Sequence, residues 1–215
     1  MRELRIIFDL DGTITDSGAG IIHGFRIVLE RFGLPMIPPE LERSVVGPPL
    51  RDSFLRFGIE EQRIDEAVKM YRTFYIAEGQ YENFVYAGIE QMLKTLKACG
   101  YRLYIATSKP ETMAINILKY FGLDEYFDLI CGAAEDRSRD TKEKVITHLL
   151  VQIGDGSRAI MVGDTVYDVI GAGALGVPAI GVAWGYGQTQ QMRDAGAIEI
   201  ADDPAQLTKM LLAFK

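Results

Sequence analysis

Short apolar runs alternate with amphipathic segments along most of the chain. Most of the apolar runs are uninterrupted by polar positions, as expected for strands that are buried on both faces of a sheet. They span residues 4–8, 101–107, 127–131, 158–162, 178–184 and 197–200. Helical periodicity fills the intervals between them, at residues 88–99, 111–121, 141–153, 165–175 and 188–195. This alternation predicts an α/β fold with a doubly wound parallel sheet.

The alternation is interrupted once, between the first and second predicted strands. Residues 16–83 show helical periodicity and no convincing strand pattern. One helix is expected to stop near Gly33, and residues 64–77 offer a second long amphipathic helix. We therefore expect two domains: a core formed by residues 1–15 and 84–215, and an inserted helical domain formed by residues 16–83.

The composition fits a packed globular protein, with 215 residues, 48% hydrophobic content and a net charge of −7. The negative charge and a pI near 5.0 disfavour a nucleic-acid partner, because its phosphates would be repelled. The N-terminal apolar stretch is too short for a signal peptide, and no run is long enough to span a membrane. Cys99 and Cys131 give no disulfide framework. We expect a soluble cytoplasmic protein with no membrane partner. Small anionic substrates are compatible with this composition. The sequence does not decide between a monomer and a homodimer.

The first predicted strand runs directly into two carboxylates and a glycine, at Asp9, Asp11 and Gly12. Residues two apart in an extended segment point the same way, and Gly12 then lets the backbone turn sharply. A polar turn would explain this pattern, and a calcium loop would require further ligands that are missing. Open α/β sheets, however, bind ligands at strand ends. Two adjacent carboxylates at this position therefore indicate a cation site.

The fourth predicted strand also delivers carboxylates to its end, with Asp164 directly after it and Asp168 four residues later. The two would share a helix face if the helix began at once. Asp164 alone would serve equally well as a helix N-cap. Paired with Asp9 and Asp11, it is better explained as a metal ligand.

Hydroxyl and cationic side chains follow the second and third predicted strands. Thr107 and Ser108 come where a helix is about to start, so they can either hold a phosphate or merely cap that helix. Lys142 is expected in the first turn of the next helix, where a cation opposes the helix dipole. This unfavourable placement suggests an anion or carboxylate partner. We favour Lys142 for that role, although spacing alone leaves Lys144 open.

Residues 171–176 match the dinucleotide-binding pattern G-x-G-x-x-G. The pattern should follow a strand directly and open a helix, whereas here the helix has already begun at residue 165. We interpret these glycines as allowing close packing and ending the helix.

The strand-end residues occur in the order that is typical of one known family. They are Asp9-Leu10-Asp11-Gly12-Thr13, Thr107, Lys142, and Gly163-Asp164 with Asp168. In these motifs the whole chain resembles the haloacid dehalogenase superfamily of phosphohydrolases. The insertion resembles the helical cap of that family, and Gly47-Pro48-Pro49-Leu50 is similar to a cap loop of its phosphoglycolate phosphatase-like branch. The resemblance implies the strand order 3-2-1-4-5, with the sixth strand at the edge beyond the fifth.

The resemblance also implies a role for each site residue. Asp9 would attack phosphorus to form an aspartyl-phosphate, and Asp11 would protonate the leaving oxygen and then activate water. Mg²⁺ would be held by Asp9, the Asp11 carbonyl and Asp164, with Asp168 fixing a coordinated water. The expected phosphate-binding residues are Gly12, Thr107, Ser108 and Lys142. Lys109 and Arg51 are candidate contacts to a second anionic group of the substrate, or else surface cations.

The implied activity is Mg²⁺-dependent hydrolysis of a small phosphomonoester, such as phosphoglycolate, a nucleoside 5′-monophosphate or a sugar phosphate. A dehalogenase is disfavoured, because Asp11 supplies the acid that a phosphate ester's leaving group needs. A phosphomutase of the same family shares the motifs and stays open. A non-enzymatic, receiver-like signalling module is disfavoured, since the third predicted strand ends without an acid and receivers lack a large helical insertion.

Overall fold

The structure is a computed structural model that describes residues 4–136, 138–154 and 158–214; residues 1–3, 137, 155–157 and 215 lie outside the described part. The chain divides into two compact units. The core unit comprises Met1–Thr15 and Val85–Lys215, and the helical unit comprises Asp16–Phe84. The chain passes between them at β2 (Thr15–Asp16) and β3 (Phe84–Val85), which form a two-stranded sheet.

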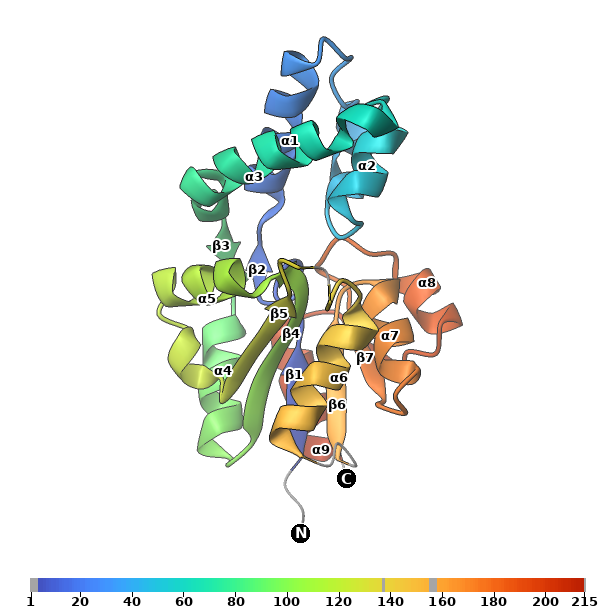
Figure 1. Ribbon diagram of the computed structural model, residues 1–215. Helices are drawn as coiled ribbons and strands as arrows, with labels where there is room; N and C mark the ends of the chain where they lie inside the picture. Colours follow the sequence, from blue (N-terminus) through green and yellow to red (C-terminus); the bar gives the residue numbers. More distant parts are fainter. Residues whose placement is uncertain (1–3, 137, 155–157, 215) are drawn as a thin grey trace. The chain divides into compact units, whose positions relative to one another are not determined.

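A six-stranded parallel sheet forms the centre of the core unit (Figure 1). Its strands are β1 (Arg5–Phe8), β4 (Arg102–Pro110), β5 (Leu129–Ala133), β6 (Ala159–Gly163), β7 (Ala179–Val182) and β8 (Glu199–Ala201). Their spatial order is β5-β4-β1-β6-β7-β8. The predicted α/β fold and strand order, with the sixth strand at the edge, are therefore confirmed.

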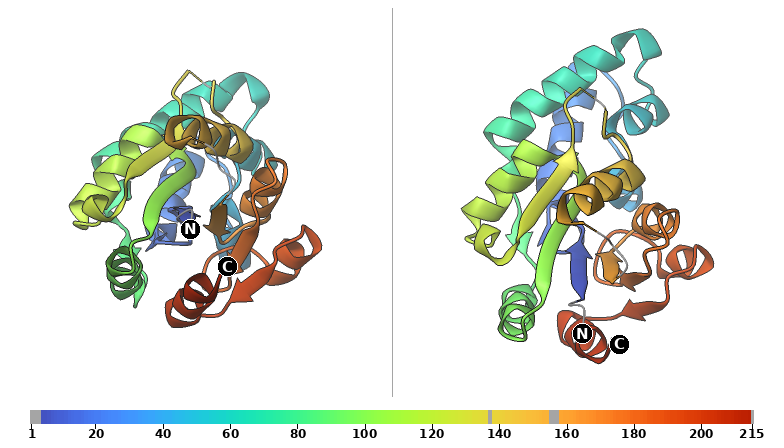
Figure 2. Two further views of the ribbon diagram at one scale, coloured as in Figure 1. Left: turned by 90° about the horizontal axis from the view of Figure 1, so that it is seen from below. Right: turned by 60° about the horizontal axis from the view of Figure 1, so that its bottom comes forward.

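Helices cover both faces of this sheet (Figure 2). One face carries α4 (Ile89–Ala98), α5 (Glu111–Tyr120) and α9 (Pro204–Ala213); the other carries α6 (Lys142–Ile153), α7 (Val166–Gly173) and α8 (Thr189–Asp194). A short 3₁₀ turn, Asp124–Tyr126, precedes β5. Within β1, Ile6 and Phe8 face the first layer and Ile7 faces the second. This alternation explains why the strand is apolar throughout.

Two helices show how the sequence pattern and the structure relate. In α7, a Cβ at Gly171 would lie 3.0 Å from the Glu143 backbone nitrogen, so the glycine lets α7 approach α6 closely. The predicted close packing is thus seen at Gly171, whereas no atom of the described residues lies within 4 Å of a Cβ at Gly173, where α7 ends, or at Gly176. By contrast, α9 is absent from the predicted helices. It is capped by Asp203, which accepts from the Gln206 N–H at 2.7 Å, and it buries Leu207 and Leu211 in the core.

The helical unit contains α1 (Gly18–Arg31), α2 (Leu50–Arg56), α3 (Ile64–Ala77) and the 3₁₀ segments Pro39–Val45, Glu61–Arg63 and Gly79–Tyr81. Its interior is aromatic, with the Phe25 and Phe54 rings 4.4 Å apart and Tyr71 stacked on Tyr75. The unit therefore has a hydrophobic core of its own. Among the described residues of either unit, no helix combines the length and apolar character needed to cross a membrane.

Candidate active site

The loop after β1 places Asp9 and Asp11 at the carboxyl end of the sheet. β1 ends at Phe8, but the Asp9 N–H still donates to the Val162 carbonyl at 2.9 Å, which extends the pairing with β6 by one residue. The chain then turns back, with Gly12 at a φ of 83° and its N–H donating to the Thr15 carbonyl at 2.7 Å. Only glycine adopts this conformation without strain. The Asp9 side chain is buried, and Asp11 is partly exposed.

Lys142 connects Asp9 with Asp168. Its Nζ lies 2.8 Å from Asp9 Oδ1 and 2.8 Å from Asp168 Oδ1, and it donates to the Ala106 carbonyl at 3.0 Å. The ammonium group comes from the first turn of α6, as predicted. Lys144 instead lies on the surface, 2.7 Å from Asp140 Oδ1. Of the two lysines that spacing left open, Lys142 is therefore the one at the site.

Asp168 is fixed by its own helix as well as by Lys142. Thr165 caps α7, and Asp168 Oδ2 accepts from the Thr165 N–H at 3.0 Å and from its hydroxyl at 2.8 Å. The Thr165 side chain in turn accepts from the Asp168 N–H, and the reciprocal pair forms a capping box. The alternative in which Asp164 caps the helix is wrong, because the cap is the next residue. The predicted role of Asp168 in holding a coordinated water stays a prediction.

Asp164 is fully buried beneath the loop that follows β7. The Tyr186 N–H donates to Asp164 Oδ2 at 2.8 Å, and the Thr13 hydroxyl lies 3.5 Å from Oδ1. A Cβ at Gly12 would lie 2.2 Å from Oδ2, and one at Gly185 would lie 2.3 Å from the Asp164 Cβ. Two loops therefore approach this carboxylate so closely that only glycines fit.

Sequence reasoning missed the loop after β7. Besides Tyr186, it contributes Trp184, whose indole N–H donates to the Thr13 carbonyl at 3.1 Å. At Gly187, a Cβ would lie 2.0 Å from the Asp164 carbonyl oxygen. The available signal was the glycine pair at 185 and 187, directly after a buried strand, because such glycines indicate a close backbone approach.

Of the two roles considered for Lys109, the surface cation is wrong, and the contact to the substrate stays a prediction. Instead of being a surface cation, it is buried, with Nζ 2.8 Å from Asp11 Oδ2. Asp11 Oδ1 is buried and has no hydrogen-bond partner among the described residues. Lys109 lies on β4 beside Thr107, whose buried hydroxyl accepts from the Lys109 N–H at 3.2 Å, while Ser108 is exposed. Lys109 therefore holds one oxygen of Asp11 and leaves the other available.

Arg51 belongs to the helical unit, on α2, where it forms an ion pair with Asp65. Its side chain is 37% exposed. A contact between Arg51 and a substrate stays a prediction.

Burial of several carboxylates in one place shifts their proton affinities. Burial, together with Asp168 and Asp11, raises the pKa of Asp9 to about 6, even though Lys142 acts in the opposite direction. Burial and the charges of Asp168 and Asp9 raise the pKa of Asp164 well above its usual range. Burial opposes the charge of Lys142, but Asp168 and Asp9 outweigh it and raise its pKa. The site carries more negative charge than its lysines neutralise.

The same carboxylates fit a hard divalent cation. Asp9, Asp164 and Asp168 each offer an oxygen, and these oxygens lie within 4.8 Å of one another. Mg²⁺ prefers oxygen ligands, retains several waters and needs only one or two carboxylates. Burial raises the pKa of Asp9 and of Asp164, and the positive charge of a bound cation would favour their ionised forms. The donor set therefore suits Mg²⁺, with Asp9 and Asp164 as the carboxylates that are not committed to a helix cap.

Known proteins match both the sequence and the fold. The sequence profile of the family described as "Haloacid dehalogenase-like hydrolase" matches residues 6–182. Tyrosine-protein kinase PtkA of Mycobacterium tuberculosis is 42% identical over 184 residues, which cover 85% of this chain but only 63% of that protein. The chain thus spans less than two thirds of that relative. A 5′-nucleotidase of Pseudomonas aeruginosa is 38% identical over 215 residues, covering 98% of this chain and 96% of the relative.

The crystal structure of a predicted phosphatase from Clostridium acetobutylicum matches with a TM-score of 0.93 at 38% identity, covering 99% of each chain. Its agreement in fold extends over both units. With the profile match and the aspartate site at the end of β1, these similarities show that the chain belongs to the haloacid dehalogenase-like hydrolases.

Proposed function

We propose that the protein is a Mg²⁺-dependent phosphatase that hydrolyses small phosphomonoesters through an aspartyl-phosphate on Asp9. The observation that carries this proposal is the buried ion pair between Asp9 and Lys142, with Asp11 held beside it by Lys109. A carboxylate nucleophile and a separate proton donor are the two groups that double displacement at phosphorus requires. Family membership and the 5′-nucleotidase relative support the same activity.

In the first step, an Asp9 oxygen forms a bond to phosphorus while the bond between phosphorus and the ester oxygen breaks. Asp11 gives its proton to that leaving oxygen, so the alcohol departs neutral. The Asp11 atom free to carry the proton is Oδ1, since Oδ2 is paired with Lys109. Lys109 thereby fixes the orientation of the acid.

In the second step, Asp11 takes a proton from water as the water oxygen attacks phosphorus, and the bond to Asp9 breaks to release phosphate. Lys142 stays beside the Asp9 oxygen and compensates its charge in both steps. Thr107 and the backbone N–H of Ser108 are the proposed contacts to the phosphoryl oxygens. Mg²⁺, held by Asp9, the Asp11 carbonyl and Asp164, would neutralise the phosphate and lower its repulsion from the carboxylates.

The substrate class is best approached through the relative that matches the chain from end to end. That relative is named 5′-nucleotidase, so a nucleoside 5′-monophosphate is the first substrate to test, followed by phosphoglycolate and sugar phosphates. We further propose that the helical unit is the cap that selects among them. Arg51→Ala would then raise KM for the preferred substrate more than it lowers kcat.

The proposal is tested by measuring phosphate release from this panel with and without Mg²⁺. Asp9→Asn serves as the blank for contaminating phosphatases, because it removes the nucleophile with little change in volume. We expect metal-dependent release that the variant lacks. Equal release by Asp9→Asn and the unmodified protein would contradict the assignment of Asp9.

A second candidate function is transfer of the phosphoryl group to an acceptor other than water. It is favoured by the 42% identity to a relative named tyrosine-protein kinase, and a phosphomutase would use the same aspartates. Incubating the phosphorylated protein with a tyrosine peptide or with a sugar phosphate distinguishes the alternatives. Phosphate in the acceptor indicates transfer, whereas free phosphate indicates hydrolysis.

A further inference from the structure

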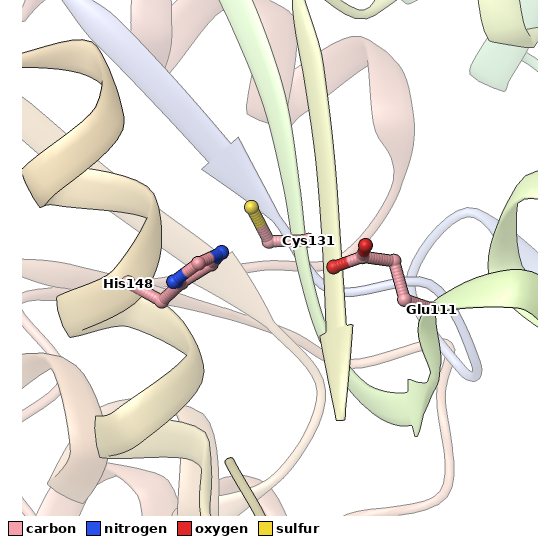
Figure 3. A group of neighbouring side chains, drawn as sticks. All are labelled: Glu111, Cys131 and His148. Atoms are coloured by element: carbon pink, nitrogen blue, oxygen red, sulfur yellow. The ribbon is translucent and has the colours of Figure 1, made fainter. Parts of the chain in front are cut away.

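Three side chains with different donor atoms converge beside β5, away from the carboxylates of the active site. Glu111 begins α5, Cys131 lies within β5 and His148 lies on α6, so they come from three separate elements. Figure 3 shows His148 and Glu111 pointing toward Cys131 from opposite sides. One carboxylate oxygen, the thiol sulfur and one imidazole nitrogen all lie within 4.8 Å of one another.

A contact of Gln152 shows where two of these donors direct their lone pairs. The Gln152 amide nitrogen lies 2.6 Å from His148 Nε2 and 3.8 Å from Cys131 Sγ. An amide NH₂ group donates, which makes His148 Nε2 the acceptor in this contact. The His148 nitrogen and the Cys131 sulfur therefore both face the position that the Gln152 amide nitrogen occupies. The amide is a neutral and weak hydrogen-bond donor to both.

The third donor is held rigidly. A Cβ at Gly132 would lie 2.5 Å from the Glu111 Cα, so the start of α5 packs directly on β5 next to Cys131. Glu111 Oε2 accepts from the Gly132 N–H at 3.2 Å and from Arg139 at 3.1 Å. Both contacts are made by Oε2. Among the described residues Oε1 has no hydrogen-bond partner, so this oxygen is available to bind a metal ion.

The cluster opens onto a cavity of about 560 Å³ that both Glu111 and His148 line, together with Arg139. Carboxylate, thiolate and imidazole are the ligands that zinc takes in proteins, and catalytic zinc sites combine three of them with one open position. Soft sulfur and imidazole donors favour zinc over magnesium. The donor set therefore differs in kind from the all-oxygen site around Asp9.

We propose that Glu111, Cys131 and His148 form a zinc-binding site whose fourth position opens to this cavity. In tetrahedral zinc sites the ligand atoms lie about 3.5 Å apart, so donors that lie within 4.8 Å of one another need to approach by no more than about 1.3 Å. Displacement of the Gln152 amide frees the His148 ring to make that movement. The sulfur binds as thiolate and releases its proton on binding.

The site is one strand away from the catalytic lysine. Cys131 pairs with Ala106 in the β4–β5 register, and the Ala106 carbonyl accepts from Lys142 Nζ. Glu111 also follows directly on the strand that carries Thr107 and Lys109. An ion at Cys131 would thus contact elements that position the phosphate site without sharing a ligand with it.

The test is a titration of the chelator-treated protein with Co²⁺, which substitutes for zinc and gives a near-ultraviolet charge-transfer band only with a thiolate ligand. We expect the band in the unmodified protein and its removal by added Zn²⁺. Cys99→Ser is the matched control, because Cys99 is the exposed free cysteine and should leave the band unchanged. Cys131→Ser should abolish the band, and Glu111→Gln should weaken Co²⁺ binding about tenfold or more.

Gln152→Ala is a further test, because this substitution should raise the affinity for Co²⁺ instead of lowering it. Gln152 is exposed, so its removal should not disturb folding, and losing one weak competing hydrogen bond should tighten Co²⁺ binding about threefold. Absence of the band in the unmodified protein, its persistence in Cys131→Ser or its loss in Cys99→Ser would each overturn the proposal. Because the band reports a thiolate, binding of Co²⁺ at the Asp9 site alone would leave it absent and would count against the proposal.

Discussion

The charge on Lys142 is the main compensation for a group of buried aspartates. The sequence indicated this residue through an unfavourable position at a helix start, but it could not separate Lys142 from Lys144. Both lysines lie in the first turn of α6, and only the rotation of that helix against β4 determines which one turns inward. The sequence likewise gave no sign that Lys109 pairs with Asp11, because side-chain direction at the irregular end of β4 depends on a register shift.

Replacing Lys142 by methionine should remove both activity and stability. The change leaves Asp9 and Asp168 buried without their cation, which should lower the free energy of unfolding by about 3–5 kcal/mol. Loss of the charge beside the nucleophile should lower kcat by at least about 100-fold. Phosphate release and urea unfolding measure the two effects. Lys144→Met is the matched control; a similar loss in that surface variant would contradict the assigned role of Lys142.

The raised pKa of Asp9 predicts how the metal-free protein responds to pH. In the folded state the pKa is about 6, above its ordinary value of 3.8, so between these values the folded protein binds more protons than the unfolded chain. The free energy of unfolding should therefore fall as pH rises from about 4 to about 6, by roughly 3 kcal/mol from this group. Asp9→Asn should lose the share that comes from Asp9, while Asp164, whose pKa is also raised, keeps its own share.

Urea unfolding in the presence of a chelator, at pH values from about 4.5 to 7, measures the effect as the difference between the two proteins. A chelator is needed because a bound cation would favour the charged carboxylate. Identical pH dependence in the unmodified protein and in Asp9→Asn would show that Asp9 ionises normally.

Among the elements, strands and helices were predicted well wherever an apolar run was unambiguous. Observed ends differ from the predicted ends by a few residues, since hydrophobic residues such as Trp184 continue beyond the last strand pairing. α9 was missed although Asp203 and Pro204 form a standard helix start. The loop after β7 was missed because its contacts with Asp164 are made by backbone groups, which have no side-chain signature.

The glycine turn after β1 should tolerate no side chain. Gly12→Ala would strain a residue at positive φ and place a Cβ 2.2 Å from Asp164 Oδ2, displacing that carboxylate. A displacement of about 1 Å should lower kcat about 100-fold. Gly122→Ala is the control, because Gly122 also has positive φ but no atom lies within 4 Å of its Cβ position. Steady-state phosphate release should fall in the first variant only; equal activities would show that the Gly12 turn does not position the site.

At the scale of the whole molecule, the order of the strands in the sheet brings the strand-end residues together in one site. Strand order in a doubly wound sheet brings β1 and β6 together, and so places Asp9 beside Asp164 although the two lie 155 positions apart in the sequence. The family prediction is confirmed by the profile match. The zinc ligands, in contrast, could not be predicted, since they are single residues on α5, β5 and α6 without a recognisable spacing.

The most direct test of the account is to trap the covalent intermediate. The protein is mixed with a phosphomonoester that it turns over in Mg²⁺, quenched in acid and reduced with borohydride, which converts an aspartyl-phosphate to homoserine. Peptide mass spectrometry then locates the reduced residue. We predict homoserine at position 9 and none in the sample that lacks substrate. Active turnover with no reduction at Asp9, or with reduction at another aspartate, would contradict the central claim.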